Sequence, residues 1–330
     1  MNRLVIRLLL SLFLASCGHK DNSAAFDELL SQPPYAGITD SIKKEPGRDE
    51  LYFNRAILLN KNNLPEPSLA DFRKAWSLNK KEQYAYGIST ILLEKRPDSA
   101  ILFLNQSVKE LPESFLLQLN LARAYDAQNK TDDALKVVSE IVKTHPEQLN
   151  ALLLKADLLD KKGDLAAAVE TLEKAYGLAP YNADLNHNLG FKYAQTKNAK
   201  TVAFCDTMIK KDQAGLHAEP YYFKGVYYSN INDKAKALSF FDQAIQHDYN
   251  FLDAHMEKGQ LLFEQKKLEE AAKSFSLAST ISPSYADAYY WTGRCQEAAG
   301  NKEEARLNYQ RAYGLDKTLT EAKEAADRLK

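Results

Sequence analysis

Large and small side chains recur along this chain at helical spacing. Tyr221, Gly225 and Tyr228 are separated by four and then three residues, which places them on one face of a helix. Ala237 and Phe241 repeat the four-residue step in the segment that follows. Small residues let two helices approach closely, and aromatic rings fill the space between them. The pattern therefore predicts a pair of packed amphipathic helices.

This helix pair recurs with a period of 34 residues. Gly225, Gly259 and Gly293 keep that spacing. The same period separates three further sets, which are Ala237, Ala271 and Ala305; Phe241, Phe275 and Tyr309; and Ala244, Ala278 and Ala312. Pro112, Pro146 and Pro180 are also 34 residues apart, and each is expected to end a second helix because proline cannot donate the next backbone hydrogen bond. One period shared by independent positions predicts a repeat array.

The repeat resembles the tetratricopeptide repeat family. Tyr221, Gly225 and Tyr228 match its first helix, and Ala237-x3-Phe241-x2-Ala244 matches its second helix. The resemblance implies an all-α, right-handed superhelical α-solenoid of stacked antiparallel helix pairs. Eight repeats over residues 49–319 are expected to start near residues 49, 81, 115, 149, 183, 218, 252 and 286. Residues 320–330 are expected to form a C-terminal capping helix, which a solenoid end needs to cover its last apolar face.

Two segments depart from the pattern. Asn62 to Pro67 is expected to disrupt the turn between the helices of the first repeat. Residues 198–211 lack the alanines and the closing proline of a second helix. The second helix of that repeat is therefore expected to be shifted. Whether the segment also bends the array and splits it into two stacked halves stays open from the sequence.

The first residues read as an export signal. Two arginines precede a short apolar run, Leu8 to Ala15, which is too short for a membrane span of about 20 residues. Leu14-Ala15-Ser16-Cys17 resembles the bacterial lipobox, which implies a signal peptide over residues 1–16 and a lipid-modified, palmitate-bearing Cys17. Residues 17–48 then supply the anchor, a linker and N-terminal capping helices, with Pro46 as their terminator.

The resemblance to lipoproteins also implies a location. Gly18 rather than aspartate follows Cys17, which favours the outer membrane of a Gram-negative bacterium. The periplasmic side and the cell surface both remain open. The following His19, Lys20 and Asp21 match a surface-export signal only loosely.

Composition narrows the function without naming it. Lys+Arg number 43 and Asp+Glu 44, so the net charge of -1 gives no support to nucleic-acid binding. Only 13 glycines and 11 prolines interrupt the chain, which favours helices.

Motifs of catalysis are absent from the sequence. No phosphate-binding loop, dinucleotide-binding motif, zinc-protease motif or nucleophile elbow occurs, and no two histidines are three or four residues apart. We therefore predict no enzyme activity, no cofactor, no metal and no small-molecule substrate. Cys205 and Cys295 lie in different repeats and are expected to be buried apolar residues rather than a disulfide. His255 is expected in the core.

The binding surface is expected on the first helices, which line the concave side of such a solenoid. In the resembled family, the second, fifth, ninth and twelfth residues of the first helix face the groove. Those positions and their neighbours give the predicted partner-binding residues, which are Asp184, His187, Asn188, Tyr222, Val226, Met256, Gln260, Tyr290, Trp291 and Arg294. The packing of Tyr222 and Tyr290 against the adjacent repeat is an equally good reading.

The predicted groove is aromatic and acidic. Such a surface favours a basic or amphipathic peptide partner over a free carboxylate tail. The leading hypothesis is a non-enzymatic, lipid-anchored scaffold that binds a protein or peptide in envelope assembly, secretion or cell-wall maintenance. The alternative is a protein that binds glycan or peptidoglycan fragments, because aromatic rings also suit the faces of sugars.

Overall fold

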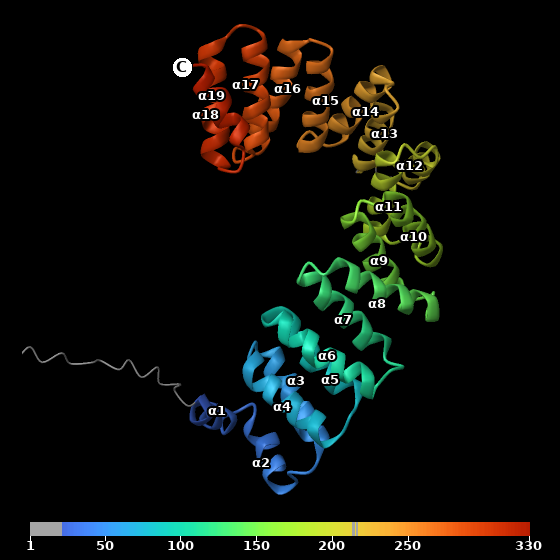
Figure 1. Cartoon of the computed structure of the whole chain (residues 1–330), viewed down its shortest axis with the longest axis vertical. Coiled ribbons are helices and arrows are strands. Elements are labelled where there is room, and N and C mark those ends of the chain that lie inside the picture. The colour runs from blue at the N-terminus through green and yellow to red at the C-terminus, as the bar shows by residue number, and fades with distance from the viewer. Residues whose placement is uncertain (1–21, 213–214, 216) are drawn as a thin grey trace, which may run out of the picture. The chain divides into compact units, whose positions relative to one another are not determined.

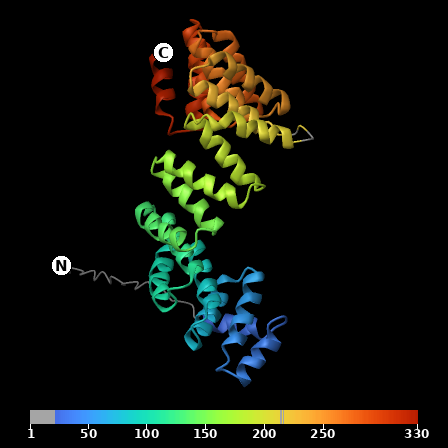
Figure 2. The same ribbon diagram turned by 90° about the vertical axis from the view of Figure 1, so that its right-hand side faces the viewer.

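The structure is a computed structural model that describes residues 22–212, 215 and 217–330. All regular elements in these residues are α-helices (Figures 1 and 2). They are α1 (Asn22–Leu30), α2 (Ala36–Lys44), α3 (Asp49–Lys61), α4 (Pro65–Leu78), α5 (Glu82–Lys95), α6 (Pro97–Glu110), α7 (Phe115–Ala127), α8 (Thr131–Thr144), α9 (Leu149–Lys161), α10 (Leu165–Leu178), α11 (Ala183–Gln195), α12 (Lys200–Lys211), α13 (Glu219–Asn230), α14 (Lys234–His247), α15 (Leu252–Glu264), α16 (Leu268–Ile281), α17 (Ala286–Ala298), α18 (Lys302–Leu315) and α19 (Thr320–Arg328).

Within each unit the helices follow one another in antiparallel pairs, and consecutive helices pack on one another from α3 to α7 and from α9 to α19. Figure 1 shows these helices in order along the chain. The odd-numbered helices from α3 to α17 are the first helices of the eight expected repeats. Their starts differ from the expected starts by at most one residue. The predicted all-helical stack of helix pairs is confirmed.

The chain is divided into two compact units. The boundary falls inside α8, between Val137 and Val138. It does not fall in the degenerate segment 198–211, which belongs to the second unit. The two units therefore do not separate at that segment.

Glycines of the second unit hold the two helices of a pair together. A Cβ atom on Gly225 would lie 2.5 Å from the ring of Phe241, and one on Gly259 would lie 2.6 Å from the ring of Phe275. Both rings are completely buried. The sequence pattern of a small residue facing an aromatic one is thus realised as direct ring-to-backbone packing.

The repeat that starts at Ala183 is built differently. Its second helix, α12, has 12 residues, whereas α10 and α14 have 14. A Cβ atom on Gly190 would lie 2.8 Å from the ring of Phe223, which belongs to the following helix pair. The ring of Phe204, from its own pair, would lie farther away, at 3.3 Å. An aromatic residue of the next repeat therefore fills the place that the shortened helix leaves.

A common backbone conformation reverses the chain within seven of the eight pairs that the structure describes. One residue in each turn has a positive φ, and these residues are Asn63, Asn129, Gly163, Lys197, Asn232, Lys266 and Gly300. Asn63 has a φ of 57°, so the turn expected to be disrupted by Asn62 to Pro67 is regular, and that prediction is wrong. The exception is the second repeat, in which Arg96 alone separates α5 from α6.

A buried ion pair ties the first helices of the chain to the array. Arg55 of α3 donates two hydrogen bonds to the carboxylate of Asp71 on α4, at 2.6 and 2.7 Å. A third nitrogen of Arg55 donates to the Thr39 hydroxyl of α2 at 3.0 Å. Both charged side chains are buried, so the pair fixes α2, α3 and α4 against one another.

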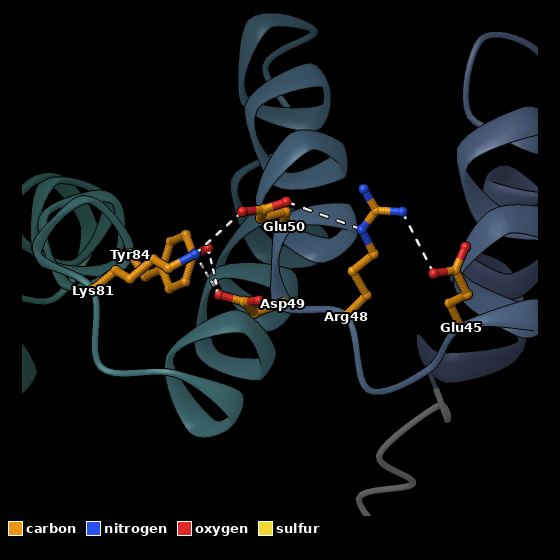
Figure 3. Close-up of polar contacts among 6 residues, drawn as sticks. All are labelled: Glu45, Arg48, Asp49, Glu50, Lys81 and Tyr84. Carbon is orange, nitrogen blue, oxygen red and sulfur yellow. Dashed lines mark hydrogen bonds and ion pairs between the residues drawn. The ribbon is translucent and has the colours of Figure 1, made fainter.

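Polar contacts also link the N-terminal ends of α3 and α5 (Figure 3). The Lys81 ammonium lies 3.0 Å from Asp49 and 3.3 Å from Glu50, and the Tyr84 hydroxyl donates to Asp49 at 2.7 Å. Arg48 lies between Glu50 and Glu45. The hydrogen bond from Tyr84 and the Lys81 ammonium hold the pKa of Asp49 below its usual value.

The last helix closes the stack. α19 packs three alanines, Ala322, Ala325 and Ala326, against α18 and leaves its charged side chains exposed. Arg328 of α19 donates to Glu297 of α17 at 2.7 Å. Across the described ranges, no helix combines the length and the hydropathy that crossing a bilayer requires.

Candidate partner-binding site

The predicted partner-binding residues lie on four first helices of the second unit, α11, α13, α15 and α17. The structure gives them three degrees of exposure. Asp184, His187 and Asn188 are exposed; Val226, Gln260, Tyr290, Trp291 and Arg294 are half-buried; Tyr222 and Met256 are buried. Cys17 lies outside the described residues.

Tyr222 and Met256 do not offer their side chains to a partner in this structure. Tyr222 is 8% exposed and Met256 5%. The ring of Tyr222 packs edge-on against that of Phe251, with 5.0 Å between centroids, and lies tilted against that of Phe241, at 5.9 Å. These contacts correct the expectation that the two residues form part of the surface, because surrounding side chains cover both of them, whereas His187 at the same position of α11 is exposed.

The exposed residues of α11 line a hollow of their own. Asp184 and His187 line a hollow of about 700 Å³ together with Met208 and Lys211 of α12. His187 also meets the ring of Phe223 edge-on at 5.1 Å. This hollow lies at the repeat with the shortened second helix.

Aromatic rings gather on α17 and hold a guanidinium group. Arg294 lies over Trp291 at 4.4 Å, over Phe263 at 4.9 Å and over Tyr290 at 5.9 Å from the ring centroids. Trp291 in turn stacks on Phe275 at 5.6 Å. Tyr290 and Arg294 line a pocket of about 530 Å³ that extends to α19.

Three carboxylates lie around Tyr285, which precedes α17. Asp253 and Glu257 lie one turn apart on α15, and Asp287 lies in the first turn of α17. Among the residues that the structure describes, none of the three forms an ion pair with a lysine, arginine or histidine. We call Asp253, Glu257, Asp287, Tyr285 and Tyr290 the acidic-aromatic face.

These groups lie close enough to affect one another's ionisation. Burial raises the pKa of Glu257 above its usual value, and the charges of Asp253 and Glu264 raise it further. Burial likewise raises the pKa of Tyr285, with Asp287 and Asp253 adding to the effect. Each shift disfavours negative charge, so a cation brought to this face would relieve the repulsion.

Basic side chains on α13 and α15 do not supply that cation. Lys224 pairs with Asp206 at 2.7 Å and Lys258 with Asp242 at 2.6 Å, so both ammonium groups face the preceding second helix. The first-helix side is therefore left with a surplus of negative charge. It can accept a basic group from outside the chain.

Sequence reasoning missed Glu257 and Tyr285. Glu257 follows the groove position of Met256, and Tyr285 precedes α17, so neither falls on the four family positions. The four-residue step from Asp253 to Glu257 was the signal that places them on one helix face.

The remaining candidate groups occupy structural positions. His255 is buried, and its Nε2 lies 2.9 Å from the backbone oxygen of Tyr249, as expected of a core histidine. Cys205 and Cys295 are buried free thiols. Burial raises the pKa of Cys205 to about 12 and that of Cys295 to about 11. A search of the described residues for three or more clustered histidine, cysteine or carboxylate ligands finds no set suited to a metal ion.

Comparisons with known proteins agree with this arrangement. Models described as "Tetratricopeptide repeat" match residues 119–183, 218–250 and 287–315, and one described as "TPR repeat" matches residues 259–300. A tetratricopeptide repeat protein from Parabacteroides merdae superposes with a TM-score of 0.59 at 18% identity, over 74% of this chain and 98% of that one. PilW, described as a type IV pilus biogenesis factor, superposes with a TM-score of 0.50 at 17% identity, over 62% of this chain and 94% of its own.

Two curated relatives match this chain over a part of their own length. The human Protein O-mannosyl-transferase TMTC3 is 26% identical over 34% of this chain and 12% of its own length. Tetratricopeptide repeat protein 21B of Xenopus laevis is 22% identical over 82% of this chain and 20% of its own length. The chain thus spans a small part of these relatives. Tetratricopeptide repeat models thus match segments between residues 119 and 315, and the stacked helix pairs have the fold of a tetratricopeptide repeat solenoid.

Proposed function

We propose that this chain is a lipid-anchored adaptor that binds a basic or amphipathic segment of another protein on its acidic-aromatic face. Tetratricopeptide repeat proteins bind protein partners. The observation that carries the finer proposal is the set of carboxylates of Asp253, Glu257 and Asp287. They form no ion pair within the described residues and lie around the half-buried ring of Tyr285.

The chemistry of this face favours one kind of partner. A lysine or arginine can meet the carboxylates while its aliphatic stem lies along Tyr285 or Tyr290. Bringing a cation to Glu257 also offsets the repulsion from Asp253 and Glu264. Apolar side chains of an amphipathic segment add contact area at the rings.

The binding proposal is tested with a fluorescent amphipathic peptide that carries lysines along one face. The protein is the full chain with Cys17→Ser, which stays free of lipid. Combined substitution Asp253→Asn, Glu257→Gln and Asp287→Asn should weaken binding at least tenfold, because three charge contacts of about 0.5 to 1 kcal/mol each are lost.

A matched control removes three exposed carboxylates from second helices of the same unit, with Glu269→Gln, Glu270→Gln and Glu304→Gln. This control should retain the affinity of the parent. Equal losses in both variants would reduce the effect to net charge and contradict the proposed site. Binding of purified cell-wall fragments, with no binding of the basic peptide, would favour the glycan alternative instead.

The location is a proposal of its own. The lipobox residues Leu14 to Cys17 support lipid attachment at Cys17 and residence at the outer membrane. Metabolic labelling with radioactive palmitate should mark the parent protein and leave Cys17→Ser unlabelled. Recovery of the parent in the soluble fraction, without label, would contradict the anchor. The partner would then be sought in envelope assembly, secretion or cell-wall maintenance.

A further inference from the structure

Arg294 is the exception among the basic side chains of α13, α15 and α17. Lys224 and Lys258, on the two preceding first helices, are neutralised by Asp206 and Asp242. Arg294 forms no ion pair with any carboxylate in the described part of the chain. A guanidinium group keeps its charge in proteins. In the described residues, a positive charge that forms no ion pair therefore lies on the same helix as Asp287 and Tyr290 of the acidic-aromatic face.

The rings around Arg294 fix this charge in place. Its guanidinium lies against Trp291, Phe263 and Tyr290 at 4.4, 4.9 and 5.9 Å. Stacking restricts the side chain before a ligand arrives, so little conformational freedom remains to be lost on binding. The neighbouring carboxylate of Glu297 is already engaged by Tyr309 at 2.7 Å and by Arg328. The structure thus holds a pre-positioned donor for an anion.

Position along the helix relates Arg294 to the carboxylates. Arg294 lies seven residues after Asp287 on the continuous helix α17. Seven residues are nearly two turns, so both side chains project from the same face, about 10 Å apart along the axis. A segment in the polyproline II conformation has three residues per turn and rises about 3.1 Å per residue, so every third side chain lies on one face and three residues cover about that distance. The surface therefore presents negative charge and then positive charge at a spacing that one short segment can span.

We infer that the partner segment carries an acidic side chain whose carboxylate binds Arg294. This side chain lies about three residues from the basic residue that meets Asp253, Glu257 and Asp287, so the inference rests on the proposed function. The carboxylate belongs to a side chain and not to a chain end, because the pocket continues past Arg294 toward Glu321 and Glu324. A partner that ended at Arg294 would leave the rest of this pocket unfilled.

Three fluorescent peptides test the inference, each acetylated and amidated so that no terminal carboxylate remains. They share an amphipathic sequence with one lysine, and the third residue after that lysine is glutamate, glutamine or a second lysine. Full-length protein with Cys17→Ser should bind the glutamate peptide about fivefold more tightly than the glutamine peptide, the size of one favourable charge contact. The second-lysine peptide should bind more weakly than either.

Substitution at Arg294 supplies the decisive comparison. Arg294→Gln should abolish the preference for glutamate over glutamine while the protein still binds the glutamine peptide. Arg311→Gln is the matched control, because Arg311 of α18 also lies over a tyrosine ring, that of Tyr289 at 4.2 Å, but lies outside the pocket. This control should keep the preference.

The outcomes separate the inference from the function on which it rests. Equal affinity of the glutamate and glutamine peptides for the parent, or a preference that survives Arg294→Gln, would overturn the inference and leave the basic-segment site standing. Failure of all three peptides to bind would overturn both.

Discussion

The ring of Phe241 lies where a side chain on Gly225 would begin, 2.5 Å from the position of its Cβ atom. Gly225→Ala should therefore force the buried ring to move and lower the free energy of unfolding of the second unit by about 1 to 3 kcal/mol. Gly314→Ala, in α18 with nothing within 4 Å of its Cβ, should leave stability equal or raised by up to about 1 kcal/mol. Urea denaturation followed by Trp291 fluorescence in a Trp76→Phe background measures both. Equal effects of the two substitutions would show that the ring adjusts without cost.

Removal of one partner from the buried pair of Arg55 and Asp71 should be severe. Asp71→Ala leaves a buried guanidinium without its carboxylate and should cost about 3 to 5 kcal/mol in the first unit. The control is Asp40→Ala, which breaks an exposed pair with Lys43 and should cost at most about 1 kcal/mol. Trp76 fluorescence in a Trp291→Phe background reports on the first unit alone. A loss near that of Asp40→Ala would mean that water reaches Arg55.

Acid should weaken the contact between α3 and α5. The hydrogen bond from Tyr84 and the charge of Lys81 lower the pKa of Asp49 in the folded state. Its stabilisation is therefore present above the ordinary carboxylate pKa of about 4 and is lost as the pH falls through the lowered value. In urea titrations between pH 2.5 and 6, the parent should lose stability more steeply than Asp49→Asn, with Tyr84→Phe in between. Parallel pH profiles for the three proteins would exclude this linkage.

Binding of a basic peptide should depend on the ionisation of Glu257. Burial, together with Asp253 and Glu264, raises the pKa of Glu257 in the free protein. Because a bound lysine favours the carboxylate, affinity should fall as the pH is lowered through this raised pKa. Fluorescence anisotropy from pH 7 to pH 4.5 at constant ionic strength should show a smaller fall for Glu257→Gln. A fall of the same size in that variant would assign the titration to another group.

The two buried thiols should be protected from modification. Cys205 and Cys295 are at most 1% exposed, and burial raises their pKa to about 12 and about 11. In the Cys17→Ser protein at pH 8, a thiol reagent should react slowly in buffer and fully in urea, because only the thiolate is nucleophilic. Rapid reaction in buffer, with an unchanged circular dichroism spectrum, would reveal local opening of the second unit.

The fold could be predicted from the sequence because its repeated residues contact one another within a single helix pair. Gly225 with Phe241 and Gly259 with Phe275 each define one helix pair, and the period carries that unit along the chain. The regular turn at Asn63 was not predicted from the sequence. The prolines after it lie in the first turn of α4, where a backbone N–H has no partner within the helix and its loss costs nothing. The division inside α8 has no local mark, since it depends on packing between repeats.

The candidate site was predicted less completely, for a related reason. Family positions place Tyr222 and Met256 in the groove, yet the side chains of adjacent repeats decide whether such a position is open. Phe251 covers Tyr222, and it lies on another repeat. Glu257 is a candidate because no basic side chain of the described residues forms an ion pair with it. The spacing of residues in the sequence does not show which side chains pair in the fold.

The shared backbone conformation of the turns has a consequence for how this chain can change in length. Asn232, Lys266 and Gly300 hold equivalent places 34 residues apart. Deletion or duplication of a 34-residue block between two such points joins chain ends of the same local geometry and keeps every following helix in phase. Its evolution can therefore proceed by whole modules, with the chemistry of each first helix gained or lost as one unit.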